Sequence, residues 1–406
     1  MDENWMIADL HIHSCFSRAC SSAINFENLV KWAKIKGVHL LGTGDFTHPT
    51  WFEEIKKLRD NGNGFYYYDD FPFVISGEIS LIYTQERGRR IHLVVLVPSI
   101  EIAERINSYL DTKGRRDYDG RPIFKVPGDE FVREMMKIST EIEVIPAHIW
   151  TPWFGMFGSM SGFDSLEECF KEEVHNVHAI ETGMSSDPEM NWKIKDLEKK
   201  SIVSFSDAHS FWPFRLGREA TIFRRCDSYS ELIRQIREND FIETIETDPA
   251  YGKYHFDGHR VCGFSSSPEK TKELNCICPV CGKLLTVGVD FRVGALLDKN
   301  SNHEVKKEFY RLLPLHELIS LVTGVGMQSK KVWAIYNNLI KEFGNEFNIL
   351  LEVSKEQLIS KEVDGKLIEV ILRNREGKIK VKPGFDGEYG VAQVSNLSEE
   401  SQKTLF

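Results

Sequence analysis

Asp-Leu-His-Ile-His, at residues 9–13, is the stretch from which the organisation of this 406-residue chain can be worked out. It follows the apolar run Met6–Ala8, so it reads as the end of a first β-strand. Because alternate side chains of a strand share a face, we expect Asp9, His11 and His13 to point one way and the aliphatic residues between them into a core. Two imidazoles and a carboxylate on one face can bind a divalent metal. A pair of surface histidines at a strand end is the competing interpretation.

Later strand-like runs carry the same residue types, most of them at the end of the run. The runs are His39–Asp45, Phe73–Glu78, Ile91–Leu96, Val144–His148 and Val203–His209. Helix-like segments separate them, at residues 25–36, 50–60, 130–139, 188–200 and 228–239. Alternating strands and helices predict an α/β fold with a largely parallel sheet. If that sheet closes as a barrel, its polar strand ends gather on one face.

The motifs over residues 1–245, taken as a set, resemble the PHP family, named for polymerase and histidinol phosphatase. The resemblance implies a distorted (β/α)7 barrel with up to three metals on one face, and hence an enzyme. It implies a first metal at the catalytic centre, with the ligands His11, His13, Glu78 and Asp207. Glu78 would bridge to a second metal, with the further ligands His92 and His148. Taken alone, a histidine inside an apolar run such as His92 is more simply a core residue.

The resemblance assigns Asp45 and His209 to a third metal. The family pattern has Thr-Asp-His in this motif, whereas residues 43–45 here read Thr-Gly-Asp, so a carboxylate replaces a histidine. His48 lies close enough in sequence to compensate. Another histidine of the family pattern falls near residues 19–20, which are alanine and cysteine. The third site therefore has fewer candidate ligands than the other two.

A second predicted unit covers residues 246–300 and carries a zinc-binding pattern. Cys-Pro-Val-Cys-Gly-Lys at residues 278–283 has the form of a zinc knuckle, and an upstream histidine and cysteine supply a matching two-residue gap. A redox Cys-x-x-Cys is the alternative, but no thioredoxin-like βαβ pattern surrounds it. His255 competes with His259 as the histidine ligand. We predict one closed, structural Zn²⁺ site formed by His259, Cys262, Cys278 and Cys281.

Residues 301–392 read as a helical C-terminal domain that binds DNA. The helix-like runs are Glu304–Leu312, Pro314–Val322 and Lys330–Phe343. The glycine turn Gly324–Gly326 between two of them either presents backbone amides to a phosphate or is a plain turn. Residues 393–406 are polar and predicted to be disordered. Within them, Gln402–Phe406 resembles the start of a peptide that binds the sliding clamp PCNA, and a tail without a partner is the alternative.

The composition limits the classes of protein to which this chain can belong. The net charge of −10 argues weakly against nucleic acid as a partner. The longest apolar stretch, Leu93–Val97, is too short to cross a membrane, and the N-terminus lacks the features of a signal peptide. Eight unevenly spaced cysteines fit a reducing compartment. We therefore expect a cytoplasmic protein without a membrane partner.

Basic residues cluster in spite of the acidic balance, and three clusters together predict a phosphate-binding groove, although each alone is more often a solvated face. The clusters are Arg87, Arg89 and Arg90, then Lys113, Arg115, Arg116 and Arg121, then Arg373, Arg375, Lys378, Lys380 and Lys382. From them we predict DNA contacts by Arg115, Arg116, Lys378 and Lys380.

An aromatic, glycine-rich loop at residues 149–163 directly follows the predicted ligand His148. One interpretation is a hydrophobic lid packed on the mouth of the barrel. The other is a set of wedges and stacking platforms for nucleotides. On the second interpretation we predict DNA contacts by Trp150, Trp153, Phe154 and Phe157.

The combination of a PHP barrel, a histidine-cysteine zinc segment and a helical end is similar to the endonuclease Q group of DNA repair enzymes in archaea and some bacteria. The resemblance implies incision 5′ to deaminated bases (uracil, hypoxanthine, xanthine) and abasic sites in double- and single-stranded DNA, with Zn²⁺ and with Mg²⁺ or Mn²⁺ for activity. Such an enzyme would flip the damaged base out of the stack. A PHP phosphoesterase acting on a small monoester and a non-catalytic, metal-stabilised DNA-binding protein are the alternatives.

Overall fold

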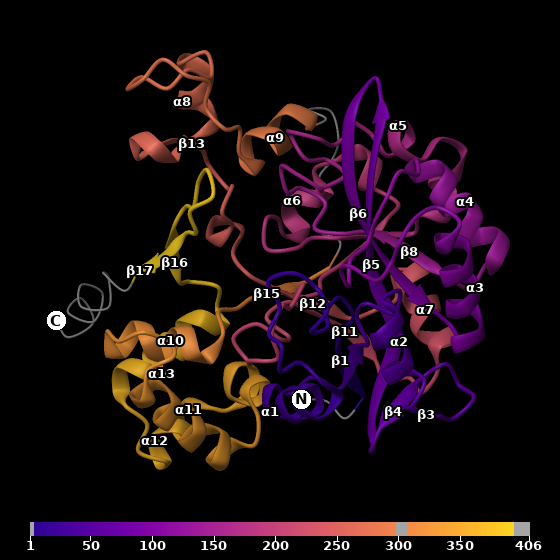
Figure 1. Cartoon of the computed structure of the whole chain (residues 1–406). Coiled ribbons are helices and arrows are strands. Elements are labelled where there is room, and N and C mark those ends of the chain that lie inside the picture. Colours follow the sequence, from indigo (N-terminus) through magenta and orange to yellow (C-terminus); the bar gives the residue numbers. More distant parts are fainter. Residues whose placement is uncertain (1–3, 298–306, 394–406) are drawn as a thin grey trace.

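The computed structural model describes residues 4–297 and 307–393. In it, the strands of the N-terminal part close into a distorted barrel, as the sequence predicts (Figure 1). The barrel strands are β1 (Trp5–Asp9), β2 (Leu40–Gly42), β5 (Phe71–Gln85), β6 (Arg87–Val97), β8 (Glu143–Pro146), β9 (Ala179–Glu181) and β10 (Ser201–Val203).

The ring of strands is closed by backbone pairing at every step. β1, β2 and β5 pair in parallel, β6 pairs antiparallel with both β5 and β8, and β9 pairs in parallel with β10. The amide of Ile149, just after β8, donates to the carbonyl of Glu181 in β9. Ile12, just after β1, forms a parallel bridge with Ala208, just after β10. The ends of β1 and β10 that carry the predicted ligands therefore lie side by side.

The long hairpin of β5 and β6 is the main departure from the predicted pattern. The strand does not end at Glu78 but continues to Gln85, which pairs with Arg87 at the start of β6. Two antiparallel strands can be joined by a tight turn, so no helix separates them. Glu78 thus reaches the barrel face from the middle of a strand, and the sheet is mixed rather than parallel throughout.

Further strands extend the sheet on both sides. β11 (Ala220–Arg224) and β12 (Glu243–Glu246) continue antiparallel from β1, and β15 (Phe309–Arg311) pairs in parallel with β12. A helix predicted at Glu304–Leu312 is therefore wrong over β15, because these residues complete the sheet of the barrel. On the other side lie β3 (Arg59–Asp60), β4 (Tyr66–Tyr68) and β7 (Ile123–Phe124).

Helices cover the barrel roughly where the sequence places them. They are α1 (Phe26–Lys36), α2 (Pro49–Ile55), α3 (Ile100–Asp111), α4 (Gly128–Ile138), α5 (Leu166–Phe170), α6 (Pro188–Trp192) and α7 (Tyr229–Arg237). Two are shorter than predicted. α2 stops because Arg59–Asp60 pairs with β4 instead, and after α6 the chain forms a short 3-10 turn at Lys195–Leu197.

The segment after β12 forms a small unit whose far end stands off from the barrel (Figure 1), while Arg292 donates to the carbonyls of Phe157 and Phe163 in the barrel loop. Its elements are β13 (Asp257–His259), β14 (Phe264–Ser266), α8 (Pro268–Glu273) and α9 (Val289–Leu296). The hairpin of β16 (Lys380–Lys382) and β17 (Val391–Gln393) reaches back to it, since Phe385 forms a bridge with Phe256. Residues far apart in the sequence therefore join this unit to the C-terminal part of the chain.

The C-terminal part is helical, as predicted. Its helices are α10 (Leu315–Thr323), α11 (Lys330–Phe343), α12 (Lys355–Ser360) and α13 (Gly365–Arg375). Lys36, the last residue of α1, is buried and donates to Glu346 at 2.7 Å, which fixes the helices against the barrel. No helix among residues 4–297 and 307–393 has the length and apolar character needed to cross a membrane. The segment Gln402–Phe406 lies outside the described residues.

Candidate metal centre

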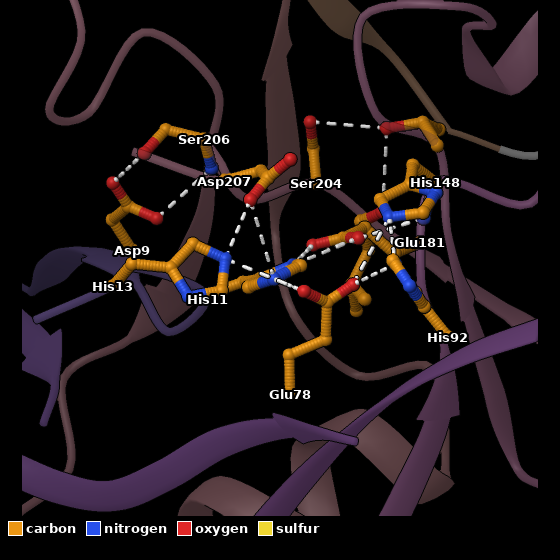
Figure 2. Close-up of polar contacts among 12 residues, drawn as sticks. Asp9, His11, His13, Glu78, His92, His148, Glu181, Ser204, Ser206 and Asp207 are labelled. Atoms are coloured by element: carbon orange, nitrogen blue, oxygen red, sulfur yellow. Dashed lines mark hydrogen bonds and ion pairs between the residues drawn. The ribbon is translucent and has the colours of Figure 1, made fainter. Parts of the chain in front are cut away.

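Four side chains from three parts of the barrel converge into the first cluster of candidate ligands: His11, His13, Glu78 and Asp207. The bridge between Ile12 and Ala208 sets the two histidines against Asp207. Nε2 of His13 lies 2.9 Å from Oδ1 of Asp207 and 3.3 Å from Oε2 of Glu78. Nε2 of His11 lies 3.6 Å from each of the same two oxygens (Figure 2). The ligand set that the sequence predicts for a first metal is therefore assembled.

The second cluster shares Glu78 with the first. Its Oε1 atom lies 2.7 Å from Nδ1 of His92 and 3.1 Å from Nε2 of His148, whereas Oε2 faces His11 and His13. All three residues of this cluster are buried. One carboxylate thus offers each of its oxygens to a different pair of imidazoles, the arrangement expected of a ligand that bridges two cations.

The orientation of His11 tests whether these residues fit a metal. Its Nδ1 atom lies 2.9 Å from Glu181, a carboxylate that can only accept, so Nδ1 carries the proton in the neutral ring. Nε2 then presents a lone pair to two carboxylate oxygens, and it is buried without a hydrogen-bond partner among the described residues. Three electron-rich atoms that face one another in a buried site fit a cation between them.

The electrostatics of the cluster agree with this. Burial disfavours the charged form of His11, but Glu181 and Glu78 outweigh it and hold the pKa of the imidazole well above its ordinary value. Burial alone would raise the pKa of Glu78, but His92 and Arg121 outweigh it and place that pKa well below its ordinary value. The surroundings of both groups therefore favour positive charge at the centre.

Residues behind the ligands fix their orientation, and the sequence analysis did not identify all of them. Glu181 binds His11 and also accepts from the backbone N–H of His148 at 2.8 Å. Nδ1 of His148 lies 2.9 Å from the hydroxyl of Thr151. Glu181 ends the short strand β9, so the same strand-end pattern that revealed the other residues could have revealed it.

Asp9 is not a candidate ligand, although the alternation of the first strand places it on the same face as the histidines. Its carboxylate accepts from the backbone N–H groups of Ser206 and Gly217 at 3.0 and 2.8 Å. It also accepts from the hydroxyl of Ser206. Its oxygens are therefore used to tie the end of β1 to the segment that carries Asp207 (Figure 2).

The structure does not assemble the predicted third metal site among the described residues. Asp45 accepts from the backbone N–H and hydroxyl of Ser14 and from the hydroxyl of Ser17. Its other oxygen lies 2.9 Å from Nδ1 of His13, so this carboxylate orients a ligand of the first cluster. His209 lies with Nδ1 2.8 Å from the carbonyl of Asp207, and His48 stacks on Phe16.

The predicted zinc site is assembled on the small unit that follows the barrel. The ligand atoms of its four residues all lie within 4.8 Å of one another: His259, Cys262, Cys278 and Cys281. His255 is outside the cluster, which decides between the two histidines. Burial raises the pKa of the Cys278 thiol, but the backbone N–H groups of Val280 and Cys281 outweigh it, so that the pKa falls below its ordinary value. A sulfur in such surroundings fits a thiolate ligand.

The aromatic loop divides into buried and groove-facing residues. Trp150 and Phe157 are fully buried, and the indole of Trp150 donates to Asn191 at 2.8 Å. These two rings hold the loop on the barrel, and their contact with DNA stays a prediction. Trp153 and Phe154 are only partly buried and line the groove over the metal centre.

That groove has a volume of about 1040 Å³ and runs past Asp207, His92 and His148. The cations that line it are Arg18, Arg121, Arg215, Arg218 and Lys253. Most of the predicted basic clusters have other partners. Arg89 donates to the carbonyl of Gly162 and holds the aromatic loop, and Arg375 donates to the carbonyls of residues 349, 350 and 353.

Of the basic residues predicted to contact DNA, Arg115 pairs with Asp117 at 2.9 Å and Arg116 with Asp111 at 2.8 Å. Lys378 pairs with Glu376 at 2.6 Å, and Lys380 is exposed on β16. Neither arginine lines the groove over the metal centre. Contact between these residues and DNA stays a prediction.

Comparison with known proteins gives similarity over the whole chain. The family model described as the MJ0043 C-terminal domain matches residues 314–378. The chain is 35% identical over 248 residues to the uncharacterized protein MJ0043 of Methanocaldococcus jannaschii, a match that covers 59% of this chain but only 31% of that protein. It is 26% identical over 402 residues to the uncharacterized protein YqxK of Bacillus subtilis, covering 94% of this chain and 98% of that protein.

Two solved structures match the fold closely. The crystal structure of PfuEndoQ from Pyrococcus furiosus, described as a lesion-specific endonuclease, superposes with a TM-score of 0.87 and 27% identity over 99% of each chain. An endonuclease Q complex with a 27-mer duplex substrate, with an abasic lesion at the active site, gives 0.86 and 28% over 98% of this chain and 97% of that one. The predicted resemblance is confirmed: the chain closely matches endonuclease Q structures over its whole length, and it has buried clusters of residues that could hold metal ions.

Proposed function

We propose that this chain is a metal-dependent DNA endonuclease that hydrolyses the phosphodiester 5′ to deaminated bases and to abasic sites. The observation that carries the proposal is the carboxylate of Glu78. Each of its two oxygens faces a different set of candidate ligands, and the site lies beside an open groove lined by cations. The likeness to an endonuclease Q complex with a duplex that has an abasic lesion supports the substrate class.

The chain's own residues would hold and orient the reacting groups. The first cluster would hold one cation, and Glu78, His92 and His148 would hold a second. Zn²⁺ would occupy the position that binds metal more tightly, and Mg²⁺ or Mn²⁺ would support activity. Such cations supply Lewis-acid activation of water and offset the charge of a phosphodiester. Glu181 and Asp45 fix the rings of His11 and His13 so that each keeps Nε2 directed at the centre.

Access to the damaged nucleotide requires that it leave the duplex. Unstacking a base costs a few kcal/mol and costs least for a damaged or mispaired base, which itself favours lesions. Trp153 and Phe154 line the groove beside His92 and His148, so their rings can contact the extruded nucleotide or its neighbours. The ring of Phe154 already lies against that of His92, with centroids 4.3 Å apart.

The remaining parts of the chain would hold the flanking DNA. We assign residues 1–245 to the catalytic barrel, 246–300 to the zinc-binding domain and 301–392 to the helical DNA-binding domain. Arg115, Arg116, Lys378 and Lys380 carry exposed or paired charges that can be exchanged for phosphate contacts. Residues 402–406 would bind a sliding clamp such as PCNA, which would bring the protein to replicating DNA in the nucleoid.

The test is incubation of the protein with labelled duplexes that differ at one nucleotide: uracil, hypoxanthine, xanthine, an abasic site or the undamaged base. Reactions contain Mg²⁺, Mn²⁺ or a chelator, and the products are resolved on a denaturing gel. We expect cutting on the 5′ side of each lesion, with a 3′-hydroxyl and a 5′-phosphate, only where divalent metal is present. Hydrolysis of small phosphate monoesters without DNA cutting would point to the phosphoesterase alternative.

A further inference from the structure

One cation of the groove touches the metal centre itself. Nη1 of Arg121 lies 3.0 Å from Oε2 of Glu78, the same oxygen that faces His11 and His13. The side chain of Arg121 is 24% exposed and lines the groove, whereas Glu78 is fully buried. A guanidinium thus lies between the carboxylate shared by both clusters and the space that a substrate would enter.

The segment that carries Arg121 is fitted closely to the cluster. Gly120 approaches so near that a Cβ atom on it would lie 2.1 Å from Oδ2 of Asp45 and 2.3 Å from the hydroxyl of Ser17. The N–H of Gly120 donates to the carbonyl of Phe16 at 3.1 Å. A larger residue at position 120 would displace Asp45, which orients His13. The position of Arg121 is therefore set by the same contacts that build the metal site.

Asp119 fixes this segment from its other side. Its carboxylate accepts from the backbone N–H of Arg121 at 3.2 Å and pairs with Arg18 at 3.1 Å. The loops around residues 14–18 and 119–121 are thus tied together above the cluster. Together these loops enclose Asp45, where a third cation was predicted, and Arg121 brings positive charge to this side of the centre instead.

A guanidinium has five N–H donors arranged as a planar fork that matches the oxygens of a phosphate. Nη1 of Arg121 donates to Glu78, and the side chain of Arg121 lines the groove. With divalent cations on both clusters, the positive charge around Arg121 would exceed the negative charge of Glu78 and Asp207. An anion bound between the cations and the guanidinium balances that excess.

We propose that Arg121 is a catalytic residue that binds a non-bridging oxygen of the scissile phosphate while Nη1 remains on Glu78. This inference rests on the proposed function and adds the group that recognises the reacting phosphate. Its charge lies where negative charge increases as water attacks phosphorus. The effect on rate therefore exceeds the effect on DNA binding, which depends on many phosphates along the groove.

The test compares Arg121→Gln with Arg224→Gln, a control variant whose exposed side chain pairs with Asp240 and does not line the groove. Single-turnover cleavage of an abasic duplex by Arg121→Gln should fall by roughly 100- to 1000-fold, with binding changed only a few-fold. Arg224→Gln should cut within a few-fold of the unaltered protein. Metal content measured on both variants should equal that of the unaltered protein.

A modified substrate isolates the contact itself. A methylphosphonate at the scissile position replaces one charged oxygen by a methyl group, tested as each pure stereoisomer. If Arg121 binds that oxygen, one stereoisomer lowers cleavage strongly in the unaltered protein and in Arg224→Gln but adds little further loss in Arg121→Gln. Independent, multiplicative losses for both stereoisomers would overturn the assignment.

Two further results would also overturn it: near-normal cleavage by Arg121→Gln, or loss of metal from that variant, which would make Arg121 a support for Glu78 only. Partial rescue of Arg121→Ala by added guanidinium ions would strengthen the assignment. The proposed function is tested separately, because it fails only if the unaltered protein cuts none of the damaged duplexes.

Discussion

The two groups of candidate metal ligands, in the barrel and in the small unit after it, are built in opposite ways. The barrel ligands come from positions between residues 11 and 207, are mostly buried, and several have a second partner that fixes the ring, such as Glu181 or Asp45. The four zinc-type ligands lie within residues 259–281. Beside them Val261, Val280 and Leu284 are 87, 66 and 73% exposed, so little apolar core supports that unit.

The difference separates two relations between metal and fold. In the barrel the core and the hydrogen bonds position the ligands, so the site exists before a cation binds. In the small unit the metal ligands must hold the chain together, so the free energy of zinc binding contributes directly to the free energy of folding. We therefore expect removal of metal to abolish the activity of the barrel without unfolding it, but to unfold the small unit.

The largest effect should follow loss of a zinc ligand. Cys278→Ser should abolish zinc binding to the small unit, because structural zinc contributes on the order of 10 kcal/mol to the folding of such a unit. Cys276→Ser is the matched control, since Cys276 is a neighbouring free cysteine outside the cluster. Elemental analysis and limited proteolysis should show about one zinc less per chain and cleavage within residues 257–285 for the first variant only.

Chelation provides a second measurement of the same contrast. A mild chelator should empty the open barrel site first and leave about one zinc, because a closed thiolate site releases metal slowly. The melting transition of the barrel should survive. Loss of all zinc with the small unit still resistant to protease would contradict the assignment of those four residues.

The next largest effect should come from the barrel. Asp207→Asn keeps the shape of the side chain but removes the charge that lies 2.9 Å from Nε2 of His13. The cation should bind more weakly and cleavage should slow by about 1000-fold, roughly 4 kcal/mol of barrier, while DNA binding persists. Single-turnover cleavage and gel shifts measure the two quantities. Asp117→Asn, an exposed carboxylate, should behave as the unaltered protein, and near-normal cleavage by Asp207→Asn would remove this residue from the centre.

The alternation of strands and helices predicts the α/β fold and the two-residue gaps predict the zinc ligands, whereas the ligand sets of the first two clusters were implied by the resemblance to the PHP family. His11 and His13 follow from alternation within one strand, and Cys278 and Cys281 from a two-residue gap. Glu181 was missed although it ends a strand, since its contact with His11 depends on where β9 lies relative to β1 in the closed barrel. Such adjacency is a property of the closed sheet and is not encoded by spacing along the chain.

The errors share that origin. Trp150 and Trp153 look alike in the sequence, yet one is buried against Asn191 and the other lines the groove. Asp45 has the right chemistry for a ligand, but Ser14 and Ser17 already occupy its oxygens. Tertiary packing decides where the side chains of an irregular loop point and which nearby donors reach a carboxylate. The periodicity of the sequence does not contain this information.

A smaller effect should separate the buried from the groove-facing aromatics. Phe154→Ala should weaken cleavage of a lesion in duplex DNA by roughly 5- to 100-fold, since stacking contributes about 1–3 kcal/mol, with less effect on the same lesion in a single strand. Trp150→Ala is the contrasting variant. It removes a core side chain, so thermal melting should show a loss of about 3–5 kcal/mol in stability and equal effects on both substrates. Equal effects of Phe154→Ala on both substrates would leave it as part of a lid.

The smallest expected effect concerns two carboxyl groups buried below the barrel cluster. Burial raises the pKa of Glu246 to about 8, and Glu219 nearby has a pKa raised well above its ordinary value by burial and by Glu246. Each has one buried oxygen without a hydrogen-bond partner among the described residues. Oε2 of Glu246 accepts from Thr182 and Ser204 at 2.9 and 3.0 Å. A protonated carboxyl at position 246 removes the repulsion between the two groups.

The sign of the pH dependence follows from the raised pKa. An unfolded glutamate ionises near 4.5, whereas the folded Glu246 keeps its proton to about pH 8. Between these values the folded state binds more protons, so the stability that this group contributes is complete at pH 4.5 and declines as the pH rises towards 8.

Glu246→Gln carries the neutral form at every pH. We expect it to lose less stability than the unaltered protein between pH 5 and pH 8, by about 1–3 kcal/mol. Denaturant unfolding of the metal-loaded protein at both pH values measures the difference, with the exposed Glu86→Gln as control. Parallel pH profiles for all three proteins would show that Glu246 is ionised in the folded state. A cation, rather than a bound proton, would then have to offset the charge of Glu246.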